Sequence, residues 1–177
     1  MRRFSILLTT LFITTTLFSN AIRAQETVNW QPIQQAETLA NKQHRKIFIQ
    51  IYTPWSEGFK ELERSVLTQS SITKYLNETY IPVKFDAETR EEVSFQGRTY
   101  KFVSQSGVSF NELASELLRG QLVYPTLVFL EEDGSLIQAI QYRTPEQFEM
   151  IITYFGSDNH KKMPWKKYER VYQALKK

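Results

Sequence analysis

Apolar and polar residues alternate along the chain in patterns that predict helices separated by strands. Residues 30–44 have apolar positions at helical spacing, and Asn29 is the expected N-cap of that helix. Residues 47–52 are apolar except for Gln50, which predicts a strand buried on both faces of a sheet. The Thr-Pro-Trp segment that follows ends the strand. Ser56 is the expected N-cap of the next helix.

The remaining pattern extends this order to the end of the chain. The further elements expected are a helix at 69–77, a strand at 80–85, a small hairpin about Gln96-Gly97, a helix from the cap Ser109 to Arg119, a hairpin of strands 127–130 and 136–142, a helix from Thr144 to Phe155, and an amphipathic helix at 165–175. This order indicates an α/β fold with a mixed sheet covered on both faces. The irregular insert at 87–108 is expected to be a flap over one sheet edge, with an interaction surface as the alternative.

The first 24 residues have the organisation of a secretory signal rather than of a folded domain. A basic start is followed by an apolar stretch at 4–18 and by Ala24, a small residue suited to a cleavage site. The apolar stretch is shorter than the ~20 residues of a spanning helix, which favours cleavage over an uncleaved anchor. We therefore expect an exported protein, periplasmic or extracellular, without stable membrane insertion after cleavage.

Charge and composition narrow the classes of partner. Of the 22 basic residues three precede position 25, so the rest of the chain balances 19 basic against 19 acidic residues. This balance does not favour a nucleic-acid partner. A basic patch surrounds Trp165, but Glu169 and the overall neutrality favour a solvated helix face over a membrane contact. The patch consists of Lys161, Lys162, Lys166 and Lys167.

The chain has no cysteine and only two histidines, which limits the thiol and metal chemistry that it can support. The chain contains no cysteine, so neither a disulfide nor a thiol reaction is available. The two histidines, His44 and His160, are far apart in the sequence and have no ligand-like spacing. We expect no metal site and no cofactor.

Three segments resemble the thioredoxin family. The predicted strand at 47–52 runs into a turn with Trp55 and Lys60 at the family's spacing. Tyr124-Pro125-Thr126 precedes an apolar strand and an Asp-Gly turn, and residues 142–148 are similar to the start of the family's last helix. The resemblance implies a thioredoxin-like three-layer α/β/α domain at 25–156. An insert precedes its third core helix, and a C-terminal helical extension at 157–177 packs on or flanks the domain.

The same resemblance implies that the redox centre is lost. Ser56 and Phe59 stand where the family has its two cysteines, and Gln50 replaces the family's buried acid. Dithiol exchange needs a thiolate, which a serine hydroxyl does not replace. We interpret Ser56 as a helix cap rather than a nucleophile. For Phe59 we favour core packing over ligand contact.

The resemblance also implies a peptide-binding groove in which Pro125, when cis, presents backbone to a bound segment. The groove residues expected on this basis are Trp55, Ser56, Glu57, Tyr124 and Pro125. The leading hypothesis is a non-enzymatic scaffold or binder of a protein or peptide. The alternatives are an enzyme that uses Ser56, Glu57 or another groove residue, and an accessory subunit whose partner supplies the chemistry.

Overall fold

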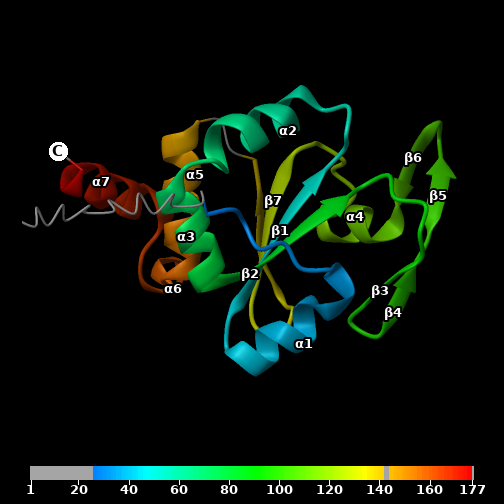
Figure 1. Ribbon diagram of the computed structural model, residues 1–177, viewed down its shortest axis with the longest axis horizontal. Helices are drawn as coiled ribbons and strands as arrows, with labels where there is room; N and C mark the ends of the chain where they lie inside the picture. The colour runs from blue at the N-terminus through cyan, green and yellow to red at the C-terminus, as the bar shows by residue number, and fades with distance from the viewer. Residues whose placement is uncertain (1–25, 142–143, 177) are drawn as a thin grey trace, which may run out of the picture.

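The computed structural model describes residues 26–141 and 144–176, in which helices cover both faces of a central sheet (Figure 1). The sheet has the order β2-β1-β7-β8. Its strands are β1 (Lys46–Tyr52), β2 (Tyr80–Asp86), β7 (Thr126–Leu130) and β8 (Leu136–Ile140). β1 runs parallel to β2 and antiparallel to β7. The mixed sheet predicted from the sequence is therefore confirmed.

Two hydrophobic clusters, one on each face of the sheet, hold the helices in place. The first cluster involves α1 (Ile33–Gln43) and α4 (Glu112–Leu117). The second involves the π-helical turn Leu62–Val66, which continues α2 (Glu57–Glu61), together with α3 (Ser70–Thr79), α5 (Pro145–Gly156) and α7 (Trp165–Leu175). A short α6 (Asn159–Lys162) connects the last two. The three layers expected from the sequence are present.

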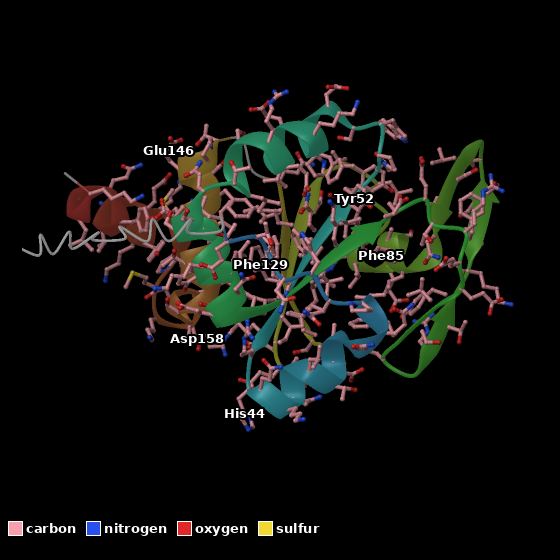
Figure 2. All side chains as sticks on the ribbon, in the orientation of Figure 1. His44, Tyr52, Phe85, Phe129, Glu146 and Asp158 are labelled. Atoms are coloured by element: carbon pink, nitrogen blue, oxygen red, sulfur yellow. The ribbon has the colours of Figure 1, made fainter. Side chains whose placement is uncertain are left out.

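β1 is apolar at most of its positions because each of its faces packs against one cluster. Ile47, Ile49 and Ile51 belong to the cluster around α1, whereas Phe48 belongs to the opposite one. The Phe48 ring lies 5.5 Å from that of Phe129, which occupies the middle of the molecule (Figure 2). Side chains alternate between faces along a strand, so a central strand needs apolar residues at nearly every position.

Two predicted helix caps are wrong. Asn29 does not cap α1; its backbone N–H donates to Asn77 Oδ1 at 2.8 Å, and α1 has Pro32 at its N-cap. Ser109 lies in a strand, and Asn111 caps α4 by accepting from the Leu113 N–H at 3.1 Å. In both places tertiary pairing of the flanking backbone decides where the helix begins.

The insert consists of two hairpins rather than one. β3 (Val93–Phe95) and β4 (Arg98–Tyr100) pair around Gln96 and Gly97, both at positive φ, which confirms the predicted turn. Val93, Phe95 and Tyr100 are buried in the cluster with α1 and α4, so this hairpin is part of the core and not a flap. The second hairpin was not predicted; it joins β5 (Phe102–Gln105) to β6 (Val108–Asn111).

The C-terminal helices pack on α5 through aromatic residues. The Tyr168 ring lies 4.9 Å from that of Tyr154, whose hydroxyl donates to the Met163 carbonyl at 2.8 Å. α7 forms the end of the molecule opposite the insert hairpins (Figure 1). The expected signal segment at 1–24 and the predicted strand end at Tyr142 lie outside the described residues.

Candidate functional site

Ser56 joins the helix that follows β1 to the segment before β7. As the N-cap of α2, its side chain accepts from the Phe59 N–H at 3.4 Å, which confirms the predicted cap. The Ser56 hydroxyl donates to the Tyr124 carbonyl at 3.2 Å. In the described part of the chain these backbone groups are its hydrogen-bond partners, and no basic side chain takes its proton. The arrangement is that of a structural cap and not of an activated nucleophile.

Pro125 lies directly against the first turn of α2. The Tyr124–Pro125 peptide bond is cis. A Cβ atom at Gly58 would lie 2.9 Å from Pro125 Cδ, too close for ordinary packing. Glycine at position 58 therefore allows the helix and the proline to touch, a requirement that the sequence analysis missed.

Trp55 is exposed but held in one orientation. Its side chain is 63% accessible, and its indole N–H donates to both carboxylate oxygens of Glu88 at 3.1 Å. Glu88 follows the end of β2, where its own N–H donates to Asp86 Oδ1 at 2.9 Å. Sequence reasoning missed Glu88; the acidic residues directly after a buried strand were the available signal.

Tyr124 lies beside the same carboxylates. Burial raises the pKa of the Tyr124 phenol to about 12, and the negative charges of Glu88 and Asp86 add to the shift. Within residues 26–141 and 144–176 the backbone N–H of Tyr124 donates to no group. We call this region the Trp55 surface, defined as Trp55, Ser56, Glu88, Tyr124 and Pro125.

Glu57, also expected in the groove, is engaged elsewhere. It accepts from Lys60 Nζ at 2.6 Å, and both side chains are largely exposed. The pair lies at adjacent turns of α2, where such exposed ion pairs contribute little to stability. The structure does not join Glu57 to the other groove residues through a hydrogen bond.

Phe59 packs beneath the turn as one wall of an aromatic cluster. Its ring stacks on Tyr52 with centroids 4.2 Å apart, and Lys84 Nζ lies 4.8 Å from its centre. Lys84 in turn pairs with Glu63 at 2.8 Å. The predicted packing role agrees with these contacts, although Phe59 stays partly exposed. The cation and its aromatic neighbours fill the position below the lost redox centre.

Gln50 is completely buried at the position of the family's acid. Its Nε2 lies 3.5 Å from Glu63 Oε1, and within the described chain its Oε1 has no partner. The nearest carboxylate therefore comes from the π-helical turn and is already paired with Lys84. A neutral amide neither takes nor gives a proton at ordinary pH.

The histidines lie away from this surface. His44 ends α1 at the amino end of β1, and Tyr52 lies at the opposite end of that strand (Figure 2). Ser56 follows Tyr52 along the chain. His160 lies with Glu131 and Asp158, and one potential ligand atom from each falls within 4.8 Å of the others. Sequence spacing did not show this grouping. Lys46 and Lys161 each bond to its carboxylates, so its negative charge is already balanced.

A cavity of about 200 Å³ lies at the β8 edge of the sheet. Its lining residues are Leu118, Arg119, Gln121, Leu136, Gln138 and Ala139.

Among the described residues, none of the helices has the length and apolar character needed to cross a bilayer.

A buried strand that leads into a capped helix, with a cis-proline segment against that helix, defines a thioredoxin-fold protein. The chain belongs to the family of the thioredoxin-like domain, whose sequence model matches residues 33–156. No curated protein sequence matches the chain. Because it contains no cysteine, dithiol chemistry is absent from this member of the family.

Solved structures show the same fold at low sequence identity. The chain is similar to a protein described as DsbH oxidoreductase (TM-score 0.56, 14% identity, covering 88% of this chain and 95% of that one). It is also similar to a putative disulphide-isomerase from Bacteroides thetaiotaomicron (TM-score 0.52, 20% identity, 76% and 96% covered). A thioredoxin from Thermus thermophilus gives a TM-score of 0.53 at 15% identity, with 71% and 85% covered.

Proposed function

We propose that this thioredoxin-fold protein is exported and binds a protein or peptide segment through the Trp55 surface, without catalysing a reaction. Export is supported by the basic start, the apolar stretch at 4–18 and the small residue Ala24. The binding role is supported by the geometry around Trp55. The oxidoreductase names of the structural neighbours describe those proteins, and such chemistry requires thiols that this chain lacks.

The observation that carries the proposal is an exposed tryptophan beside an unused backbone donor. Trp55 offers a large apolar face held by Glu88, so little side-chain freedom remains to be lost on binding. The Tyr124 N–H, which has no partner in the described residues, is available to a carbonyl of an extended segment. Tryptophan is enriched among the residues that dominate binding energies.

The enzymatic alternative is weaker on the same geometry. A serine nucleophile needs a base within hydrogen-bond reach, and the Ser56 hydroxyl donates to a backbone carbonyl instead. An accessory subunit of a larger complex remains compatible with a binding surface. The accessory-subunit hypothesis and the free-binder hypothesis use the same surface and differ only in the identity of the partner.

Photo-crosslinking tests the proposal. A crosslinking amino acid placed at Glu57, next to Trp55, is compared with one at Gln34, an exposed position of α1, both in the protein expressed in its native host. We expect a discrete adduct from position 57 that is lost in Trp55→Ala and kept in Val108→Ala, which trims an exposed apolar side chain next to the turn of the β5–β6 hairpin. Adducts that survive Trp55→Ala, or that arise equally from position 34, would contradict binding through the Trp55 surface.

A further inference from the structure

The neutral charge of residues 25–177 conceals two parts of opposite charge. The segment 157–177 carries seven basic and two acidic residues, whereas 25–156 carries twelve basic and seventeen acidic residues. The net charges are therefore +5 and −5. The expectation of a solvated helix face rested on overall neutrality, and the structure places the positive part at one end of the molecule, on α6 and α7 (Figure 1).

The exposed side of α7 combines basic and apolar residues in two rows. Lys166 and Arg170 form one row at helical spacing, and both are exposed. Lys167, Val171 and Leu175 form the other, with Val171 and Leu175 43% and 82% accessible. Glu169, the other reason for expecting a solvated face, is partly buried and belongs to neither row.

The cations of these rows are not neutralised within the described chain. Lys162, Lys166, Lys167 and Arg170 form no ion pair there, and the Lys162 and Arg170 side chains donate only to backbone carbonyls. The neighbouring Lys161 and Lys176 differ, because they pair with carboxylates of the body. We call the set Lys162, Lys166, Lys167, Arg170, Val171 and Leu175 the basic helix surface.

We propose that the basic helix surface adsorbs to an anionic phospholipid membrane without inserting across it. A convex helix at the end of the molecule meets a flat surface without needing a complementary groove. Phosphates satisfy the lysines and arginine, and the acyl boundary accepts Val171 and Leu175. An acidic protein would satisfy the charges but would not account for exposed Leu175 in the same row as Lys167.

The acidic body strengthens the orientation. Its net charge of −5 is repelled by an anionic surface while the +5 segment is attracted, so the protein would adsorb with α7 toward the lipid. This inference does not depend on the Trp55 surface. It concerns where the protein is located and assigns no ligand to the Trp55 surface.

Vesicle co-sedimentation tests the proposal with residues 25–177, which contain every buried hydrophobic side chain of the described chain. The vesicles contain phosphatidylcholine alone or phosphatidylcholine mixed with phosphatidylglycerol. We expect binding only to the anionic vesicles at about 0.1 M salt and its loss at about 1 M, where the screening length falls to about 3 Å. The variant Lys162→Gln, Lys166→Gln, Lys167→Gln, Arg170→Gln should bind about 600-fold more weakly, at about fivefold per charge.

A matched control removes four charges from the body: Lys42→Gln, Lys74→Gln, Lys101→Gln and Arg119→Gln. This control has the same net charge as the test variant. Because its substitutions lie away from the basic helix surface, it should bind anionic vesicles about as tightly as wild type does. Val171→Ser with Leu175→Ser should weaken binding to vesicles but not to polyglutamate. Equal losses in both four-site variants, no binding to anionic vesicles at low salt, or tighter binding to polyglutamate than to vesicles would each overturn the proposal.

Discussion

Replacing Gln50 by methionine should stabilise the protein, although Gln50 is fully buried in the central strand. Its Oε1 has no partner in the described chain, and a buried polar atom left without a partner costs about 1–3 kcal/mol. Its Nε2 makes one long contact, at 3.5 Å, to a Glu63 carboxylate that Lys84 already satisfies. Losing a hydrogen bond costs about 0.5–1.5 kcal/mol. Methionine has a similar length and no strongly polar atom, so the net gain in the free energy of unfolding should be about 1 kcal/mol.

Urea and thermal unfolding of residues 25–177 measure this gain. A change of about 1 kcal/mol in a domain of this size raises Tm by about 2–4 °C. Gln138→Met, at an exposed position of β8, is the control and should change stability by less than about 0.5 kcal/mol. If Gln50→Met instead destabilised the protein by about 1 kcal/mol or more while the control stayed neutral, Gln50 would have a satisfied hydrogen-bonding role.

Three further predictions concern the cap, the phenol and the missing thiols. Ser56→Ala should lower the free energy of unfolding by about 1 kcal/mol in urea, because the cap bond to Phe59 is lost; Ser71→Ala, on an exposed position of α3, should not. The pKa of the Tyr124 phenol should be about 12 instead of 10, measured as the difference in tyrosinate absorbance between wild type and Tyr124→Phe. Glu88→Gln should lower this pKa, because it removes a neighbouring negative charge. Because the pKa is raised by folding, the resulting stability is complete below pH 10 and is lost as pH rises toward 12. Wild-type protein should not reduce insulin disulfides above background, and Ser56→Cys with Phe59→Cys should recover little activity while Gln50 provides no acid; strong turnover by either protein would contradict the account of the lost redox centre.

Most of the fold could be predicted because its strands carry their own signal. β1 is apolar on both faces, and β7 and β8 flank an Asp-Gly turn, so composition and spacing were sufficient. Helix starts were less predictable. Asn29 and Ser109 have side chains suited to capping, but the backbone after Asn29 pairs with β2 through Gln31, and Ser109 is drawn into a β-ladder. Local propensity does not include such partners.

In the candidate site, too, local features could be predicted from the sequence, whereas contacts between distant residues could not. Ser56 was predicted as a cap from its own sequence neighbours, and its bond to the Phe59 N–H confirms this. Glu88 and Lys84 were missed because each acts on a residue more than twenty positions away, Trp55 and Glu63 respectively. No periodicity reports a contact of that kind.

The amino-acid sequence by itself determined the four strands of the central sheet and most of the helices around them, and the absence of cysteine excluded thiol chemistry. Only the tertiary structure decided that Glu88 bonds to Trp55 and that Ser56 bonds to the carbonyl before Pro125. It also decided that the basic C-terminal segment lies at one end of the molecule (Figure 1). The physical reason is the separation along the chain of the residues that interact. Strand and helix signals arise from neighbours along the chain, whereas these contacts exist only after the sheet has brought distant segments together.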